Sequence, residues 1–267
     1  MKMFKKSLSI MLVAMMLLSA FTLCSFAAGD IKVSLRIEGI DKCLFYGDVT
    51  VGADATVLDA VKAADKADES LTATIVDSEY GPYLVDINGI VAGTYTEMMW
   101  DGWSYMVDGV SPDVGVSSYK VENGDVIVMY YGDPWNTGMQ YPEVKTDKLS
   151  EGKIYFTSMD TTYDENWNAV VAECAVKDYT LIWDGKKITP DAEGVCTIEA
   201  SLLTAGKHSI QIEKYDAKTG LPTVLRFAPD FTVTVEGSED AAEKSFFDKI
   251  KDFFMSIIEF FKNLFKF

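Results

Sequence analysis

Short runs of alternating apolar and polar residues, separated by tight-turn dipeptides, recur through most of this chain. Residues 31–37 alternate with a period of two, which is the pattern of a half-buried strand. Asn-Gly and Asp-Gly pairs favour two-residue hairpin turns, because these residue types accept positive φ. Such pairs stand at Asn88-Gly89, Asp108-Gly109 and Asn123-Gly124 in the first half and at Asp184-Gly185 in the second. The pattern predicts a mainly β protein built from short strands.

One helix is predicted in the first half, over residues 56–64. Asp54 or Thr56 can cap its start, and Val57, Val61 and Ala64 share one apolar face. Strands are predicted around this helix at residues 31–37, 44–51, 83–87, 103–107 and 125–131. Two strands, one helix and further strands are the order of a β-grasp domain, in which the helix covers one face of the sheet. We expect this domain to span residues 30–132.

A second all-β domain is predicted after a linker. Residues 133–152 are rich in Pro, Gly, Asn and Thr and are the predicted linker. Strands are predicted beyond it at residues 154–157, 169–175, 179–183, 195–199, 208–214 and 231–235. This regular spacing favours a small β-sandwich over residues 153–236, of prealbumin- or Ig-like type. Its turn pattern from residue 189 to residue 212 resembles the prealbumin-like repeats of bacterial surface proteins.

Residues 1–27 have the parts of a secretory signal peptide. Three lysines precede an apolar run over residues 8–23, and Ser25 and Ala27 occupy the small-residue positions before a cleavage site. The run has about 16 residues, whereas a membrane-spanning helix needs roughly 20. We expect cleavage after Ala27 and a secreted or extracellular cell-surface location. The alternative is an uncleaved membrane anchor.

Charge and composition exclude several classes of function. The net charge is −17, and cleavage would remove three lysines and no acid, leaving −20. Nucleic-acid binding needs a cationic face, so we expect none. The single histidine excludes a multi-His zinc site, and a Ser-His-Asp triad would have to use His208.

Asp160, Asp164, Glu165 and Asn166 could offer oxygen ligands to calcium, but their spacing differs from the EF-hand pattern and favours a solvated loop. We expect no catalytic residues and no metal site.

Cys43, Cys174 and Cys196 would remain after cleavage of the signal peptide. An odd number allows at most one internal disulfide. Cys174 and Cys196 could pair, since both lie on predicted strands of the second domain. The alternative is three free thiols, and the sequence leaves both open.

The chain ends in a Phe-rich segment, which follows a predicted linker at residues 237–244. Apolar residues from Phe246 to Phe267 recur at spacings of three and four, and seven charged residues fall largely between them. This pattern predicts an amphipathic helix over residues 245–267, and its charges exclude a membrane span. Such a helix can lie on a membrane surface, self-associate or pack on its own domain. We expect membrane-surface contact or self-association.

Four segments of the first domain occur in an order that resembles the transcobalamin-like C-terminal domain family. They are residues 57–60, 80–89, 102–109 and 119–127. The resemblance covers about residues 31–131 and implies a β-grasp fold. In the vitamin B12 carriers this module closes over a corrinoid held against a helical barrel. It therefore implies a corrinoid as the ligand, although here a β domain stands in place of the barrel and half of that site is missing.

Six residues are the predicted ligand-binding set: Tyr80, Gly81, Trp100, Trp103, Tyr105 and Trp135. The resemblance places the first two before a ligand-side strand, and Trp103 and Tyr105 on the Trp-containing strand. Met98-Met99-Trp100 departs from the family pattern and adds apolar surface. Aromatic rings beside turn backbone suit a flat, large or saccharide-like ligand. The alternative for Trp103 and Tyr105 is a place in the core.

These features together predict an exported or cell-surface binding protein that is not an enzyme. Its β-grasp domain would hold a corrinoid or another small ligand. The alternative is a structural or adhesive surface protein, in which the aromatic residues contact proteins or glycans and the Phe-rich helix anchors or assembles the chain.

Overall fold

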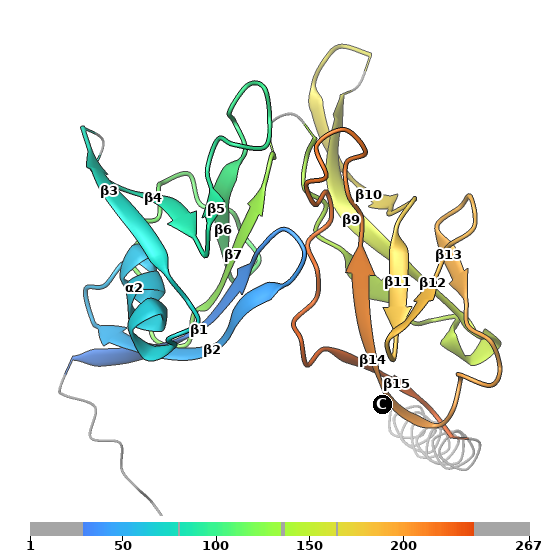
Figure 1. Cartoon of the computed structure of the whole chain (residues 1–267). Helices are drawn as coiled ribbons and strands as arrows, with labels where there is room; N and C mark the ends of the chain where they lie inside the picture. The colour runs from blue at the N-terminus through green and yellow to red at the C-terminus, as the bar shows by residue number, and fades with distance from the viewer. Residues whose placement is uncertain (1–28, 80, 135–136, 164, 238–267) are drawn as a thin grey trace, which may run out of the picture.

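The computed structural model describes residues 29–79, 81–134, 137–163 and 165–237 (Figure 1). These residues form strands in four sheets, with one α-helix and one short 3-10 helix. The prediction of a mainly β protein with one helix is confirmed. The predicted signal peptide and C-terminal helix lie outside the described residues. Within the described part, no helix is long and apolar enough to cross a membrane.

The main sheet of the first half has the strand order β2-β1-β7-β6. Its strands are β1 (Asp30–Glu38), β2 (Cys43–Gly52), β6 (Gly102–Val107) and β7 (Val126–Gly132). β1 pairs with β2 as an antiparallel hairpin and with β7 in parallel. Parallel neighbours cannot be joined by a tight turn, so the chain crosses over between β1 and β7 through a helix and further strands. This is the arrangement expected of a β-grasp domain.

Helix α2 (Val57–Ala67) lies against this sheet. Its start is fixed by a capping box, in which the Thr56 hydroxyl accepts from the Asp59 N–H and the Asp59 carboxylate accepts from the Thr56 N–H. Val57, Val61 and Ala64 are fully buried, as their spacing on one helix face predicts. They belong to one apolar core with Leu35, Ile37, Ile127 and Met129 of the central strands.

A smaller sheet with the order β3-β4-β5 stands beside the main sheet. Its strands are β3 (Ala73–Ser78), β4 (Gly81–Ile87) and β5 (Ile90–Val91). β3 was not among the predicted strands, because Ala73–Ser78 carries no tight-turn dipeptide before it. β4 pairs with β3 over its whole length, but with β5 only at Asp86 and Ile87. One edge of β4 is therefore open from Gly81 to Leu84.

Two sheets enclose the core of the second half. One holds β8 (Glu143–Lys145), β9 (Lys153–Tyr163), β10 (Ala169–Ala175) and β13 (Val195–Thr197). The other holds β11 (Thr180–Trp183), β12 (Lys186–Ile188), β14 (Gly206–Glu213) and β15 (Thr232–Val235). Phe156 from the first sheet and Trp183 and Ile210 from the second are fully buried in one cluster. Apolar side chains of both sheets thus form the inside of a β-sandwich.

Part of the predicted linker, residues 133–152, belongs to this second half. Strand β8 pairs with β9, and the short helix η1 (Leu149–Glu151) follows it. Leu149 is buried in the second core. These elements were not predicted because the segment has a turn-forming composition. A three-residue strand is also too short to show a period of two.

The three cysteines of the described residues are free thiols. Cys174 lies opposite Ser158 of β9, and Cys196 lies opposite Ile154 of the same strand. Four residues along a strand span about 13 Å. A disulfide needs Cα atoms within about 7 Å, so the pairing of Cys174 with Cys196 is excluded and the free-thiol alternative holds.

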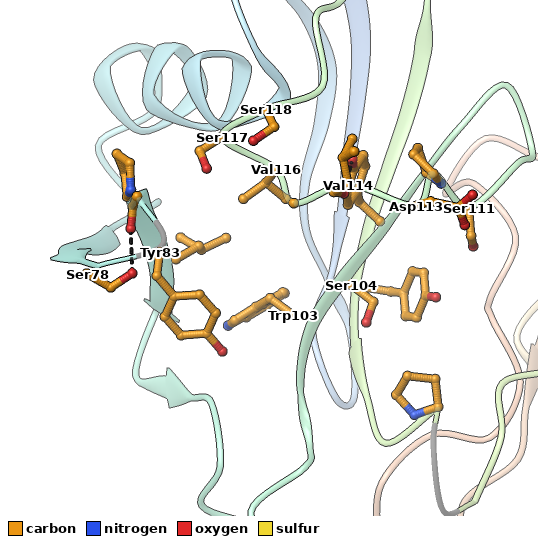
Figure 2. A pocket seen from close by; sticks show the side chains of 18 of the residues that line it. Ser78, Tyr83, Trp103, Ser104, Ser111, Asp113, Val114, Val116, Ser117 and Ser118 are labelled. Atoms are coloured by element: carbon orange, nitrogen blue, oxygen red, sulfur yellow. Dashed lines mark hydrogen bonds between the residues drawn. The ribbon is translucent and has the colours of Figure 1, made fainter.

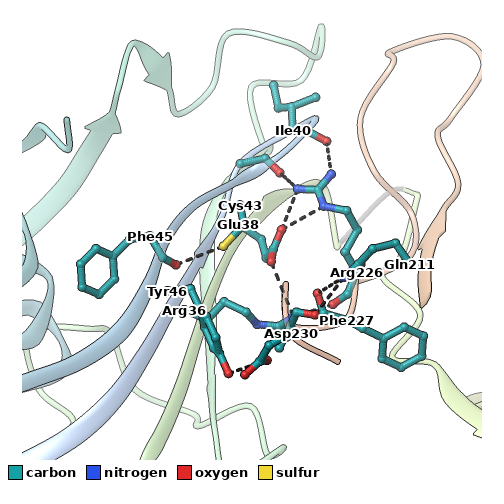
Figure 3. A network of polar contacts seen from close by, with 12 residues as sticks. Arg36, Glu38, Ile40, Cys43, Phe45, Tyr46, Gln211, Arg226, Phe227 and Asp230 are labelled. Atoms are coloured by element: carbon teal, nitrogen blue, oxygen red, sulfur yellow. Dashed lines mark hydrogen bonds and ion pairs between the residues drawn. The ribbon is translucent and has the colours of Figure 1, made fainter. Parts of the chain in front are cut away.

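A buried ion pair joins the two halves (Figure 3). Arg226 donates to the Glu38 carboxylate from Nε at 2.9 Å, and its Nη2 lies 2.8 Å from the same oxygen. Its remaining donors meet the carbonyls of Gly39 and Ile40, at 2.7 and 3.0 Å. In addition, Arg36 Nη1 donates a hydrogen bond to the Arg226 carbonyl at 2.8 Å. The Arg226 guanidinium of the second half therefore bonds to three consecutive residues at the end of β1, Glu38, Gly39 and Ile40.

We predict that Arg226→Ala lowers the free energy of unfolding by about 3–5 kcal/mol, because it leaves the Glu38 charge buried without its main partner. Urea unfolding followed by circular dichroism measures the change. Lys187→Ala is the control, since Lys187 is 71% exposed where it pairs with Glu213. Exposed pairs contribute about 1 kcal/mol or less. Equal losses in the two variants would contradict a structural role for the buried pair.

Candidate functional site

A groove of about 780 Å³ lies between β4 and β6 (Figure 2). Its lining is mainly aromatic and hydroxyl-bearing: the rings are those of Tyr83, Trp103, Tyr105, Tyr130 and Tyr141, and the hydroxyls include those of Ser78, Ser104, Ser111, Ser117 and Ser118. Grooves of this size hold small organic ligands, which they orient with a few polar groups among apolar surface. This groove is the candidate binding site.

The groove exists because β5, which follows β4, and the loop after it are joined to β6 at one end, whereas β4 and β6 stay unpaired toward the other. At the joined end, the Trp103 indole N–H donates to the carbonyl of Ile90 at 3.0 Å, and the Gly93 N–H donates to the carbonyl of Asp101 at 2.8 Å. No strand of the described residues lies between β4 and β6 beyond this point. The two strand edges therefore form the walls of the groove.

The loop from Ser111 to Ser118 closes the far end. Tyr105 donates its hydroxyl to the carbonyl of Val114 at 2.7 Å, and the Leu58 N–H at the start of α2 donates to the carbonyl of Val116 at 2.9 Å. Gly81 faces this loop with φ of +100°. A side chain is strained at that φ, and a Cβ there would lie 3.8 Å from the Ser117 hydroxyl. Position 81 therefore favours glycine for its backbone conformation, because a Cβ at 3.8 Å would make only an ordinary contact.

Backbone groups of β6 point into the groove as well. On the side of β6 away from β7, the Val107 N–H bonds to Val110 and the Asp101 carbonyl bonds to Gly93. Backbone groups alternate in direction along a strand, so those of Trp103 and Tyr105 also point away from β7. β6 is the edge strand of its sheet among the described residues. These N–H and C=O groups are available to a ligand with amide-like partners.

Hydroxyl groups cluster on the other side of β6. The Tyr130 and Tyr141 hydroxyls lie 2.7 Å apart, and Ser104 and Ser111 line the same part of the groove. Burial, together with the bond to Tyr141, raises the pKa of the Tyr130 hydroxyl. Tyr130 therefore keeps its proton at neutral pH. This end of the groove offers neutral donors and acceptors.

The charge of the groove limits its ligands. Among the described residues that line it, Asp113 is the one charged side chain, and lysine, arginine and histidine are absent. A phosphate or carboxylate would find no cationic partner there. The groove therefore favours neutral ligands or cations.

Asp101 fixes the loop that leads into β6. Its carboxylate is 3% exposed and accepts from the N–H groups of Thr94, Tyr95 and Thr96 and from the hydroxyls of Thr96 and Tyr131. Burial alone would raise the pKa of Asp101, but these hydrogen bonds outweigh it and hold the pKa below its ordinary value. The Tyr131 ring in turn meets Trp103 edge to face at 5.2 Å. Asp101 thus helps to position the main aromatic wall.

The structure brings three of the six predicted binding residues together. Gly81, Trp103 and Tyr105 line the groove. Trp100 is 54% exposed and is not part of the lining. Tyr80 and Trp135 lie outside the described residues. Ser104, Tyr141 and the loop from Ser111 to Ser118 also line the groove but were not among the predicted binding residues. Alternation along β6 was a signal for Ser104, but no local pattern marks the loop as a wall.

His208 has a structural place rather than a free imidazole. It is buried, its Nδ1 lies 2.6 Å from the Asp184 carboxylate, and its Nε2 lies 2.7 Å from the Thr204 carbonyl. Its ring stacks on Trp183 at 4.7 Å. Burial lowers the pKa of His208, but the two hydrogen bonds outweigh this and raise it overall. Both ring nitrogens are therefore occupied by hydrogen bonds within the sandwich.

The acidic segment that was weighed as a calcium loop and predicted to be a solvated loop falls partly outside the described residues, at Asp164. Asp160 accepts bonds from Gln140 and Ser158, at 3.2 and 3.3 Å. No group of three or more His, Cys, Asp or Glu residues in the described ranges could hold a metal ion.

We predict that Asp101→Asn lowers stability at pH 7 by about 2 kcal/mol or more, since both carboxylate oxygens accept several bonds and an amide NH2 cannot. Because the folded pKa is depressed, the ionised group stabilises the fold above its unfolded pKa of about 3.9, and this contribution is lost as pH falls through the folded pKa. The variant should therefore show a flatter pH dependence below pH 4. Urea unfolding from pH 2 to 7 measures both effects, and parallel profiles would contradict the assignment.

Comparisons with known proteins add three findings. A family model described as "Domain of unknown function (DUF4430)" matches residues 54–133. The chain is similar to haptocorrin in a crystal structure in complex with Cbi, at 23% identity and a TM-score of 0.35, over 39% of this chain and 25% of that chain. It is also similar to a "putative metal binding protein" from Ruminococcus gnavus ATCC 29149, at 14% identity and a TM-score of 0.29, over 39% of this chain and 97% of that chain. This chain thus spans a quarter of the haptocorrin chain. No curated protein gave a significant match.

Proposed function

We propose that this chain is an exported or cell-surface binding protein, without enzymatic activity, that holds a neutral small ligand in the groove between β4 and β6. The observation that carries the proposal is the groove itself. It combines aromatic walls, serine and tyrosine hydroxyls and open strand edges around about 780 Å³. Export is supported by the signal-peptide pattern of residues 1–27.

A corrinoid is the ligand that we propose for this groove. Corrinoids are large flat macrocycles with peripheral carboxamide groups. The rings of Tyr83 and Trp103 suit the flat face, and the outward backbone groups of Trp103 and Tyr105 suit the carboxamides. The order of motifs over residues 31–131, which resembles the transcobalamin-like family, supports the same ligand class.

The lack of a lining cation makes the proposal more specific. Cobalamin carries a phosphodiester in its nucleotide loop, and cobinamide lacks it. With Asp113 as the one charged group of the described lining, a phosphodiester gains nothing in this groove. We therefore expect cobinamide to bind at least as tightly as cobalamin.

Calorimetric titration of residues 28–267 with dicyanocobinamide and with cyanocobalamin tests the proposal. Tyr83→Ala should weaken binding about tenfold or more, because it removes a half-exposed aromatic ring from the groove wall. A tenfold loss of affinity corresponds to about 1.4 kcal/mol of binding free energy. Trp100→Ala is the matched control, because Trp100 is equally exposed but lies outside the groove, and its affinity should stay within about twofold. Absence of heat and of any spectral shift at saturating concentrations of both corrinoids would refute the corrinoid assignment.

A further inference from the structure

The hairpin of β9 and β10 extends beyond the rest of its sheet (Figure 1). β8 and β13 pair with β9 only over residues 153–157, whereas β10 pairs with it as far as Tyr163. The outer part of the hairpin is therefore a ribbon of two strands. Such ribbons are marginal in water without a third strand or a covering element.

The outer edge of β10 lacks the usual protection of a sheet edge. Proteins blunt edges with charges, prolines or very short strands. β12 and β15, at the edges of the opposite sheet, have three and four residues, but β10 has seven. Val171 is 62% exposed, and Met159 on the neighbouring strand is 61% exposed. This is a long apolar edge in contact with solvent.

The single charge on β10, that of Glu173, is paired within the chain with Lys145, which also pairs with Glu143 at 3.1 Å. Glu173 lies 2.7 Å from the Lys145 ammonium and accepts from the Thr157 hydroxyl at 2.7 Å. These two partners hold the pKa of Glu173 below its ordinary value. The carboxylate is thus fixed in one position beside the edge, where it opposes strand addition only if a second negative charge faces it.

The backbone direction shows which groups of β10 are open. The Val176 N–H donates to the Phe156 carbonyl of β9 at 2.9 Å, so the even-numbered positions face β9. Alternation turns the N–H and C=O groups of Val171, Glu173 and Ala175 outward. No strand among the described residues pairs with β10 on that side.

We propose that two copies of this chain associate by antiparallel pairing of β10 with β10 around a two-fold axis at Ala172. In this register all seven residues of β10 face the second copy. The outward N–H and C=O groups of one copy then lie opposite the outward C=O and N–H groups of the other. It places Val171 of each copy opposite Glu173 of the other. An axis at Glu173 would bring two like charges together, and an axis at Val171 would leave Glu173 opposite Ala169 and the last residues of β10 beyond the facing strand. The pairing is isologous, as a closed dimer requires.

Electrostatic repulsion between the copies opposes this association, because each copy carries a net charge of −17, or −20 after cleavage of the signal peptide. Salt screens that repulsion, with a Debye length of about 8 Å at physiological ionic strength. The dimer should therefore tighten as salt rises from about 10 to 150 mM.

Sedimentation velocity of the full chain over a range of concentrations tests the proposal. Val171→Glu faces Glu173 of the second copy and should weaken dimerisation at least tenfold. Val171→Lys faces the same carboxylate with the opposite charge and should keep or strengthen the dimer. Val110→Glu and Val110→Lys are the controls, since Val110 is 67% exposed in the first half and the charge changes are identical.

Circular dichroism of each variant verifies that the fold is intact. A wild-type chain that stays monomeric at all concentrations would overturn the proposal. So would association that persists in Val171→Glu, as this would assign the contact to another surface such as the Phe-rich terminal segment. Equal weakening by Val171→Glu and Val171→Lys would overturn the register. None of these outcomes depends on corrinoid binding, so this proposal and the proposed function stand or fall separately.

Discussion

The parallel pairing of β1 with β7 is the constraint on which the first half depends. Parallel neighbours need a long connection between them, and here the chain runs from Glu38 to Val126 before it returns. Everything that forms the groove except Tyr130, Pro134 and Tyr141 lies in that connection. The central strands bury Leu35, Ile37 and Ile127 fully and form the core on which the connection packs. The groove that we propose as the binding site is therefore formed mainly by the crossover and lies against the core.

The second half completes the site and fixes its surroundings. Tyr141, which follows the first half in the chain, places its hydroxyl 2.7 Å from that of Tyr130. Arg226 reaches back to Glu38 at the end of β1, next to the strand pair that supports the groove. Both contacts are buried or half-buried and specific in geometry. The sandwich thus contacts the β-grasp half at both of these points.

Local patterns predicted the elements that depend on local chemistry. The Thr56 cap and the apolar face of α2 could be read from sequence, because capping and helical periodicity act within one turn. Alternation with Asn-Gly and Asp-Gly turns likewise located most of β4, β6 and β7. The family resemblance, rather than these local patterns, pointed to Gly81, Trp103 and Tyr105 as site residues. The loop from Ser111 to Ser118 could not be predicted as a groove wall. Its position depends on a bond to Leu58, which is distant in sequence, and on a bond to Tyr105 of the preceding strand.

Strand pairing explains the other differences. β3 and β8 are strands because β4 and β9 offer them edges, and neither has a strong pattern of its own. The exclusion of a disulfide between Cys174 and Cys196 also depends on register along β9, which turn spacing does not determine. Likewise, only the paired sheet shows that β10 and β6 are edges.

Hydrogen exchange measured by mass spectrometry, with and without dicyanocobinamide, tests most directly whether a ligand binds between β4 and β6. Binding there should slow the exchange of backbone amides in residues 83–85, 103–105 and 111–118 and leave the sandwich strands β11 and β14 unchanged. Binding that slows exchange only outside these segments would contradict it, because the ligand would then occupy a different surface.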